Sequence, residues 1–497
     1  MCQGLKLISL SINHKNKDIL DIDFIDINKD YEEDILTSVL IGVNGVGKSF
    51  ILSTIVDVFR FVTNKNYILK YENYLLKYLI NNTLYTIKIN NRKLYLYKDN
   101  KRIDSPELFT LPDNVLALAF LINDKFPFKQ WNGLSENDDE MYVNDIYEYM
   151  GIRQVSNASW ISTISKRIAD CIIENSNSLQ FVEILKETLK FLGFDTKIKL
   201  NIYSEQKTFF KRKLSLEKLN KKINGIKKSN SIKSYMAREF KDEDKKQIVN
   251  FVNNISFNKY YEVDNEECFL EYDIDMEKKN INELIKYNNI IRKLSDIKFI
   301  KPPKVYLSKK NEFFSFDDCS SGEKQLIFTI INMASKIKRY SLVLIDEPEI
   351  SLHPNWQMGY INFIKRVFRE YYGCHIILAT HSHYLISDLE GKSSSIVVLE
   401  RKEDGYIKSK LIQSDTYAWS AENILYNIFE VRTTRNYYFE ADLRRIVSIV
   451  KNNEVDNVSK LKALIIKLNK YIFDDKDPLK LILEDAERFI KNVSENK

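Results

Sequence analysis

The chain has 497 residues, of which 44% are hydrophobic and 29% are charged, and this composition indicates a globular protein of two or three domains, or one domain with large insertions. Five cysteines without a CxxC pair argue against disulfides and a zinc knuckle, and the longest apolar runs, such as residues 115–122, are too short for a membrane helix, so we expect a cytoplasmic protein. The net charge of +6 is too small to predict nucleic-acid binding from the total.

Strand and helix patterns alternate at both ends of the chain, and the middle is helical and charged. Residues 5–41 and 83–122 have the alternation of strands. From about residue 131 to 250 the pattern is helical, and residues 251–316 mix short strands with a helix. After residue 319 helix and strand alternate again, and the C-terminal part is mostly helical.

This order predicts an α/β nucleotide-binding domain, with a mixed sheet flanked by helices, that is split by an insertion. No internal repeat and no low-complexity tract interrupts it. The expected parts are the first part of the domain at 1–130, a helical and basic insertion at 131–250, the second part of the domain at 251–400, and a mostly helical extension at 401–497.

The stretch GVNGVGKS at residues 42–49 matches the pattern G-x-x-x-x-G-K-[ST] between a β-branched strand and a helix. Its glycines let backbone N–H groups turn toward phosphates, while Lys48 can reach the β and γ oxygens and Ser49 can hold Mg²⁺. The following helix N-terminus adds partial positive charge. A glycine-rich turn without a ligand is the alternative, but the flanking elements favour a site for ATP and Mg²⁺. The predicted ATP-binding residues are Gly42, Asn44, Gly45, Gly47, Lys48 and Ser49.

Two later strands end in residues suited to phosphate chemistry. The run LVLIDEPE places Asp346 and Glu347 at the end of a buried strand, although such a pair alone is commonly an exposed turn. Together with the phosphate loop, the pair predicts Asp346 as a Mg²⁺ ligand through water and Glu347 as the general base that polarises the attacking water. The run ILATHSHYL ends in His381, a candidate contact to the γ-phosphate, whereas His375 and His383 are assigned to packing or to the surface.

The ordered set of GVNGVGKS, CSSGEKQ, LVLIDEPEISLHP and ATHSH resembles the ABC-type ATPases of the RecF, SMC and OLD class. The sequence DEPEISLHPNWQ followed by ATHSHYLISDL resembles the corresponding segments of the compact ATPases of bacterial anti-phage systems, namely PtuA of Septu and retron systems and AriA of PARIS. The resemblance covers residues 1–125 and 300–400 and, more weakly, 419–443. It implies an ABC-type P-loop ATPase that converts ATP to ADP and phosphate with Mg²⁺.

By this resemblance the loop CSSGEKQ takes the position of the L-S-G-G-Q signature. The family then implies that Ser320 and Gly322 contact the γ-phosphate of ATP bound to another protomer, and hence a homodimer or a higher oligomer built of dimers. Cys319 replaces Leu, Ser321 replaces Gly and Glu323 replaces Gln. Locally, Ser320 and Ser321 also fit the N-cap of a helix. The implied signature residues are Ser320, Ser321, Gly322 and Glu323.

The glutamine loop of the family is the poorest match. It should follow residues 115–122, where Asn123 and Asp124 are found, with Gln130 further on, and the sequence does not choose among the three. The run SLHP, by contrast, takes the place of the family's dimer-facing loop after the acidic pair.

Residues 201–250 hold 14 Lys and Arg against 6 Asp and Glu. With aromatic residues interleaved, this segment could contact the phosphate backbone of DNA or RNA. A solvated helical hairpin is the alternative. The candidate contacts are Lys211, Arg212, Lys213, Lys221, Lys222, Lys227 and Lys228.

These features predict an oligomeric ATPase that senses nucleic acid or a phage trigger and controls a separate effector, such as an HNH or toprim nuclease. A DNA repair or recombination ATPase of the RecF and SMC type is the alternative, because its motor would be the same. An OLD-type nuclease is less favoured, since it needs a further toprim domain after the ATPase. The chain after residues 395–402 is predicted to be helical, and the only DxD-like run in that part, DDKD at 474–477, sits between predicted helices.

Overall fold

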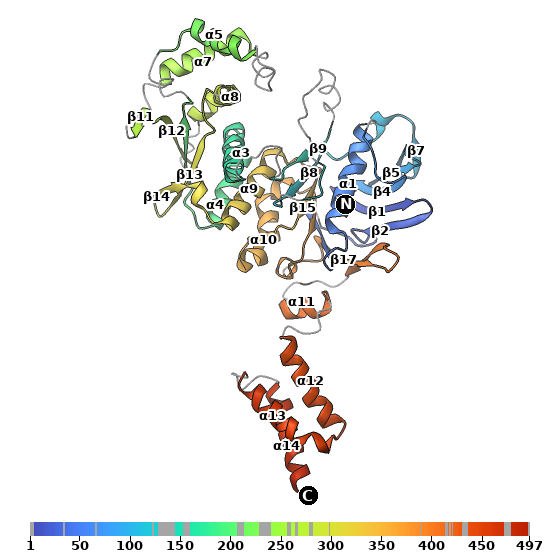
Figure 1. The fold of residues 1–497 in the computed structure, drawn as a ribbon. Coiled ribbons are helices and arrows are strands. Elements are labelled where there is room, and N and C mark those ends of the chain that lie inside the picture. Colours follow the sequence, from blue (N-terminus) through green and yellow to red (C-terminus); the bar gives the residue numbers. More distant parts are fainter. Residues whose placement is uncertain are drawn as a thin grey trace. The chain divides into compact units, whose positions relative to one another are not determined.

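Figure 1 shows the fold as a computed structural model. The chain divides into two compact units, Met1–Trp419 and Ser420–Lys497. The residues described are 4–32, 35–64, 67–121, 124–127, 145–152, 160–205, 213–227, 240–255, 260–263, 267–277, 282–297, 299–387, 389–412, 416, 419, 421–429, 436–471 and 479–495.

A mixed sheet of 13 strands forms the centre of the described part of the first unit, in the order β7-β6-β5-β4-β1-β2-β18-β17-β3-β16-β15-β8-β9. The strands from β17 to β9 in that order are parallel, and those from β7 to β2 are antiparallel. β18 joins the two parts, antiparallel to β17 and parallel to β2. The bounds are β1 Leu5–His14, β2 Lys17–Asp23, β3 Leu36–Ile41, β4 Asn73–Ile80, β5 Thr83–Asn90, β6 Lys93–Lys98, β7 Lys101–Ile103, β8 Asn114–Ala119, β9 Tyr147–Tyr149, β15 Ser341–Asp346, β16 His375–Ala379, β17 Ser394–Arg401 and β18 Ile407–Ile412.

The central parallel strands are apolar almost throughout because both of their faces are covered. β3, β8, β15 and β16 are buried at every position. Successive side chains of β15 point to opposite faces: Leu344 belongs to the core around α1 (Lys48–Thr63), whereas Ile345 lines a small hollow together with Phe328 of α9 (Ser321–Lys336). α1 and α9 therefore cover opposite faces of the sheet (Figure 1).

Further helices extend the layer that contains α9. α3 (Trp160–Asn175) and α4 (Leu179–Phe191) pack against α9, and α4 also contacts α10 (Pro354–Val367). The rings of Phe191 and Phe363 stack at this last contact with centroids 4.1 Å apart. The predicted mixed α/β fold, a large sheet flanked by helices, is thus confirmed. Single helical turns are η1 Pro106–Leu108, η2 Phe316–Asp318, η3 Arg369–Tyr371 and η4 Tyr384–Ile386.

A second, antiparallel sheet of five strands has the order β11-β12-β10-β13-β14. The interval 131–250, predicted as a helical and basic insertion, also contains strands: β9 of the main sheet and β10 of this one. In β10 the buried Ile198, Leu200 and Ile202 recur at every second position, a period that favours a strand. The elements of this region are β10 Lys197–Tyr203, α5 Leu216–Lys227, α7 Asp242–Ile255, β11 Tyr260–Val263, β12 Glu267–Asp275, α8 Asn282–Asp296, β13 Lys304–Lys309 and β14 Glu312–Ser315.

The main sheet continues past residue 401, where the sequence predicts the start of the helical extension. β17 and β18 pair as a hairpin that closes at Arg401 and Ile407, and the second compact unit begins at Ser420. Its described elements are α11 Ala421–Asn427, α12 Tyr437–Lys451, η5 Val455–Asn457, α13 Val458–Asn469 and α14 Leu479–Glu495. Ile449, Leu461 and Leu483 bring α12, α13 and α14 together in a small core. Of the helices that the structure describes, none has both the length and the apolar surface needed to cross a membrane.

Candidate nucleotide site

The predicted site residues follow three neighbouring strands. β3, β16 and β15 lie side by side and run parallel, so their carboxyl ends meet at one edge of the sheet. The loop 42–47 follows β3, Glu347 follows β15, and His381 lies two residues after β16. Ligands of open parallel sheets bind outside the carboxyl ends of the strands, so the topology itself brings together groups that are far apart in the sequence.

The phosphate loop has the backbone that its glycines permit. Gly45 and Gly47 have φ angles of +79° and +113°, a region that other residues rarely adopt. Gly47 also precedes α1 without a side-chain cap, which leaves the first N–H groups of that helix available to an anion. A Cβ at Gly47 would lie 2.8 Å from Ile407 Cδ1, and Arg401 donates a hydrogen bond to Gly45 O at 3.2 Å. The β17–β18 hairpin thus supports the loop, a role that the sequence did not indicate.

Lys48 is buried at the centre of the site. Its Nζ donates to Gly42 O at 3.0 Å and lies 2.6 Å from His381 Nε2. Burial lowers the pKa of Lys48 to about 8, while the negative charges of Glu347, Glu349 and Asp346 oppose that shift. An ammonium group surrounded by carboxylates and held by one carbonyl is suited to exchange these partners for phosphate oxygens.

Ser49 and Asp346 form a pair of oxygen ligands. Ser49 Oγ donates to Asp346 Oδ1 at 3.1 Å. Burial raises the pKa of Asp346 to about 6, and the bond from Ser49 opposes this. Among the residues that the structure describes, no cluster of three His, Cys, Asp or Glu side chains forms a complete metal cage. One hydroxyl and one carboxylate nevertheless fit Mg²⁺, which prefers oxygen ligands and commonly takes the rest from phosphates and water.

Glu347 has an unusual backbone conformation. Its φ is +48°, a left-handed conformation that costs a non-glycine residue about 1 kcal/mol or more. The N–H of Glu347 donates to Ala379 O at 2.9 Å, which fixes the residue against the end of β16. Its Oε1 lies 3.6 Å from His381 Nε2, and both side chains are partly exposed. The chain therefore maintains local strain at the position predicted for the general base.

His381 lies between the cation and the predicted base. Burial lowers its pKa, the charge of Lys48 lowers it further, and Glu347 opposes both effects. The imidazole is therefore neutral at pH 7 and can accept a hydrogen bond from Lys48. The backbone N–H of His381 donates to Glu349 Oε1 at 2.6 Å. Glu349 is absent from the predicted set, although the acidic run DEPE contains it.

The predicted signature residues form the start of α9. Ser320 is the N-cap: its Oγ accepts from Glu323 N at 3.3 Å, and Glu323 Oε2 accepts from Ser320 N at 2.8 Å, so the local prediction of a cap is confirmed for Ser320. Ser321 is the first residue of the helix. Gly322 is buried, and a Cβ there would lie 2.5 Å from Ser351 O. This glycine is therefore explained by packing within the chain.

Residues 347–353, the acidic loop, connect α9 to the nucleotide site. Gln325 of α9 is buried and donates to Pro348 O at 2.8 Å. His353 ends the loop as N-cap of α10, and its Nδ1 accepts from Asn355 N at 3.2 Å. The segment SLHP, predicted to face a dimer partner, thus also links two helices of its own chain.

Of the three candidates for the glutamine loop, the structure describes Asp124 alone. Asp124 is buried, accepts from Tyr149 OH at 2.6 Å and raises the pKa of Asp346 through its charge. It follows β8, the neighbour of β15, as the glutamine loop should. Asn123 and Gln130 lie outside the described residues.

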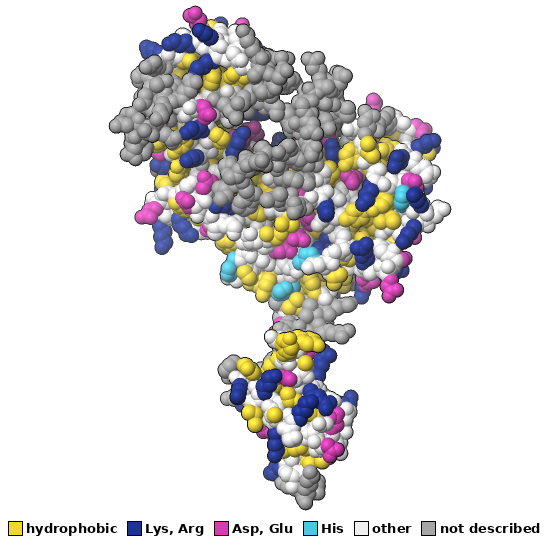
Figure 2. Space-filling model, viewed as in Figure 1, with side chains coloured by type: hydrophobic (Ala, Val, Ile, Leu, Met, Phe, Trp, Pro, Cys, Tyr) yellow, Lys and Arg dark blue, Asp and Glu magenta, His cyan; other side chains and the backbone are white. Residues whose placement is uncertain are grey.

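The basic segment is only partly described. Lys213 and Lys221 are exposed, and Lys222 is half-buried with its Nζ 5.0 Å from the centre of the Phe299 ring. Figure 2 shows Lys and Arg side chains dispersed among acidic and apolar ones on the described part of this face. The remaining candidates, Lys211, Arg212, Lys228 and the side chain of Lys227, lie outside the described residues, as does the run 474–477.

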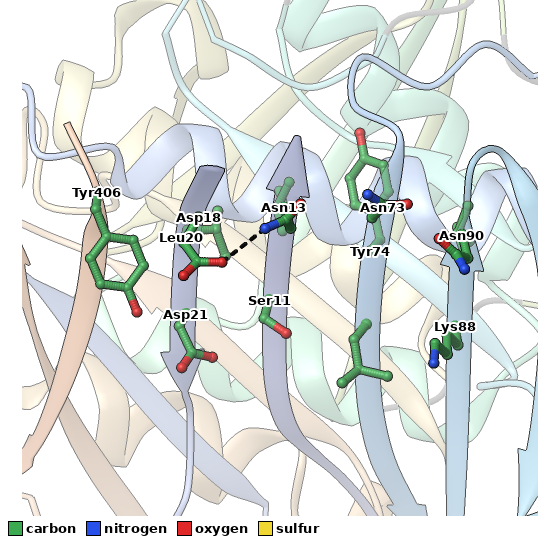
Figure 3. A pocket seen from close by; sticks show the side chains of 13 residues that line it. Ser11, Asn13, Asp18, Leu20, Asp21, Asn73, Tyr74, Lys88, Asn90 and Tyr406 are labelled. Carbon is green, nitrogen blue, oxygen red and sulfur yellow. Dashed lines mark hydrogen bonds between the residues drawn. The ribbon is translucent and has the colours of Figure 1, made fainter. Parts of the chain in front are cut away.

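A separate hollow of about 420 Å³ lies on the strands β2, β1, β4 and β5, beside Tyr406, which precedes β18. Figure 3 shows its polar lining, in which Asn13 Nδ2 donates to Asp18 Oδ1 at 3.0 Å. Asp21, Lys88 and Tyr406 add a carboxylate, an amine and a phenol. None of the residues predicted from the motifs lines it.

These groups have the chemistry of a nucleotide site, and the chain is similar to known ATPase families. Residues 205–387 match the family described as "AAA domain, putative AbiEii toxin, Type IV TA system". This span contains the signature loop, the acidic pair and His381 but not the phosphate loop. The predicted similarity to ATPases of the Septu and retron systems is confirmed by the relatives described next.

Two curated proteins are similar to the chain. "Septu protein PtuA" of Bacillus thuringiensis is 26% identical over 195 residues, which are 36% of this chain and 47% of the relative. "Retron Vc95 probable ATPase" of Vibrio cholerae serotype O1 biovar El Tor is 25% identical over 134 residues, or 24% of this chain and 25% of the relative. The chain thus matches half or less of each relative. Among solved structures, an SMC head bound to the C-terminal winged-helix domain of ScpA aligns with 82% of this chain and 97% of its own, at 12% identity and a TM-score of 0.36.

Proposed function

We propose that the protein binds Mg-ATP at residues 42–49 and hydrolyses it to ADP and phosphate as a dimer or an oligomer of dimers. The observation that supports this most directly is the meeting of Lys48, the Ser49–Asp346 pair and His381 at three adjacent strand ends. Each group has the chemistry that phosphoryl transfer needs, and catalysis of this kind depends mainly on positioning and charge.

The roles follow from the geometry. Lys48 and the N–H groups that begin α1 bind the phosphate oxygens, and Arg401 holds the loop in shape. Mg²⁺, held by Ser49 and Asp346, would neutralise charge on the phosphates. Glu347 accepts the proton of the attacking water. The neutral His381 donates a hydrogen bond to the γ-phosphate when Lys48 turns to the phosphates.

Association of two subunits completes the site in this proposal. Ser320 lies at the exposed N-terminus of α9, where its hydroxyl and nearby N–H groups can reach a phosphate held by another copy of the chain. Ser321 and Glu323 lie on the same turn. Gly322 contributes by letting α9 approach Ser351, since its own Cα is packed inside the chain.

The deciding experiment compares two variants with wild type. Glu347→Gln should lower phosphate release at least about 100-fold while ATP still binds, because the base is lost and the phosphate contacts are kept. Mass measurement with ATP should then find an associated, ATP-bound species that wild type forms only transiently. Ser320→Arg should bind ATP as a single subunit. Hydrolysis by Glu347→Gln at the wild-type rate would refute the assignment of Glu347 as the base. ATP-dependent association of Ser320→Arg would refute the proposal that two subunits share the site.

We also propose a role in anti-phage defence, in which the ATPase senses nucleic acid or a phage component and controls a separate nuclease. The resemblance of its motifs to Septu and retron ATPases supports this role. Expression with the products of neighbouring genes, followed by mass measurement with and without ATP, tests this role. A stable complex with a nuclease supports it. Purification without any such partner, together with DNA-stimulated hydrolysis, would favour a repair ATPase instead.

A further inference from the structure

Glu349 connects two residues of the proposed site without lying at the phosphate loop itself. Its Oε1 accepts the backbone N–H of His381 at 2.6 Å, a short charge-assisted bond. Its charge also acts on Lys48, whose pKa it raises against the effect of burial. Glu349 therefore affects both partners of the contact between Lys48 and His381.

The position of this carboxylate is costly for the fold. Burial raises the pKa of Glu349, and the hydrogen bond from His381 is the largest effect that opposes the rise. A buried charge disfavours folding unless its partners compensate, so a neutral side chain would satisfy one backbone N–H at a lower cost. The carboxylate is thus kept at a cost to the fold, and its oxygen Oε1 holds the loop that carries His381.

Gln357 makes a second contact between the loop after β16 and the acidic loop. Gln357 of α10 accepts a hydrogen bond from Ser382 Oγ at 2.6 Å and donates to Leu352 O at 2.9 Å. Glu349 and Gln357 thus bind the residues on which the orientation of His381 depends, one through His381 N and the other through Ser382. Both contacts tie the loop after β16 to the acidic loop, which carries Glu347.

We infer that Glu349 is a positioning residue for hydrolysis, because it holds His381 next to Lys48 and at a fixed distance from Glu347. A movement of the acidic loop then moves the base Glu347 and His381 together. The inference rests on the proposed ATP hydrolysis. Glu347 remains the base in this scheme, and Glu349 acts through the hydrogen bond that its Oε1 accepts from His381 N.

The test uses the full-length protein and three substitutions. Glu349→Ala removes both the acceptor and the charge, and should lower kcat roughly ten- to a hundredfold with the KM for ATP changed less than about threefold. Glu349→Gln keeps an oxygen acceptor of the same length, so it should recover most of kcat. Glu370→Gln, the same change on an exposed carboxylate, should match wild type.

A double-mutant cycle separates positioning from an independent contribution. His381→Ala and the double variant Glu349→Ala/His381→Ala should have the same kcat, because Glu349 acts through His381. Additive losses would overturn the inference. Loss of turnover in Glu349→Gln as deep as in Glu347→Gln would also overturn it, since Glu349 would then act as the base. A change in Glu349→Ala that affects the KM for ATP but not kcat would overturn the inference as well.

A readout without hydrolysis separates this inference from the proposed function. Diethylpyrocarbonate modifies accessible imidazoles, and mass spectrometry follows each one. Modification of His381 should accelerate several-fold in Glu349→Ala and stay near wild type in Glu349→Gln, with the exposed His353 as an internal reference. If wild type does not hydrolyse ATP, the proposed function fails. If His381 reacts equally in all variants, the positioning role fails.

Discussion

His375 and His381 lie at opposite ends of β16, and their surroundings differ in kind. His375 begins the strand in the core, where its Nδ1 accepts from Leu7 N at 2.9 Å and its Nε2 lies 2.8 Å from Ser38 Oγ. Burial lowers its pKa to about 3, so it is neutral. His381 follows the strand, is partly exposed, and faces Lys48 and Glu347.

The contrast shows what distinguishes a structural histidine from a functional one on the same strand. At the amino end both ring nitrogens have hydrogen-bond partners within the chain, Leu7 N and Ser38 Oγ, so the ring has no nitrogen left for a ligand. At the carboxyl end the ring lies between the cation of Lys48 and the carboxylate of Glu347, two charged groups at the edge of the sheet where a ligand can bind. Residue type does not separate the two, whereas burial and the charges close to each ring do.

The largest expected effect lies at the carboxyl end. Lys48→Ala should weaken ATP binding about 100-fold or more, because it removes the charge-assisted bonds to phosphate and leaves Asp346, Glu347 and Glu349 without that cation. Titration with a fluorescent ATP analogue measures this. Lys392→Ala removes an exposed lysine and should leave the affinity unchanged. Equal affinities in both variants would contradict the phosphate-binding role.

A substitution at the amino end should affect stability instead. His375→Ala leaves Leu7 N without its acceptor and opens a cavity in the core, so the free energy of unfolding should fall by about 3 kcal/mol. Urea denaturation measures the loss. The kcat of the folded fraction should stay within about twofold of wild type. A large fall in kcat without a fall in stability would show that His375 acts in hydrolysis and not in the core.

The same histidine predicts a dependence on pH. Its folded-state pKa of about 3 lies below the ordinary value of about 6.5, so the unfolded chain binds a proton that the folded chain does not. Its contribution is fully present above pH 6.5 and declines as the pH falls toward 3, by up to about 1.4 kcal/mol per pH unit. The difference in free energy of unfolding between wild type and His375→Ala should therefore become smaller as the pH falls. A difference that does not change with pH would contradict the lowered pKa of His375.

Two helical glycines test the contact between α9 and the acidic loop. Gly322→Ala would place a Cβ 2.5 Å from Ser351 O, so it should cost about 1 to 3 kcal/mol and lower kcat through displacement of Glu347. Gly359→Ala in α10 meets its nearest atom at 4.0 Å and should stabilise by about 0.5 to 1 kcal/mol. Thermal unfolding and hydrolysis measure both. Equal effects would show that the close approach at Gly322 is unimportant.

The smallest effect concerns two serine caps. Ser320→Ala and Ser178→Ala each remove a cap whose Oγ accepts an N–H, from Glu323 at 3.3 Å and from Phe181 at 3.2 Å, and each should cost about 1 kcal/mol. Only Ser320→Ala should also weaken ATP-dependent association, measured by sedimentation. If both variants associate like wild type, Ser320 is a cap and nothing more.

The sequence allowed the three strand-end motifs to be found, because each consists of a strand and a few following residues with their own pattern. It also predicted the N-cap at Ser320, which depends on residues three apart. The support from Arg401 and the bond from Glu349 to His381 could not be predicted, since each joins segments whose proximity depends on strand order. The strand β10 was not predicted, because its short alternation of buried and less buried residues lies within a charged region whose sequence pattern is mostly helical.

The position of β3 has a consequence for synthesis of the protein. β3 leads into the phosphate loop, yet its neighbours in the sheet are β16 and β17, which pair with it through residues 375–379 and 394–398. A chain growing on the ribosome therefore exposes two unpaired edges of an apolar strand until nearly the whole first unit has been made. Until then the nucleotide site cannot close, because β15 and β16, which position Asp346 and His381, have not yet been made.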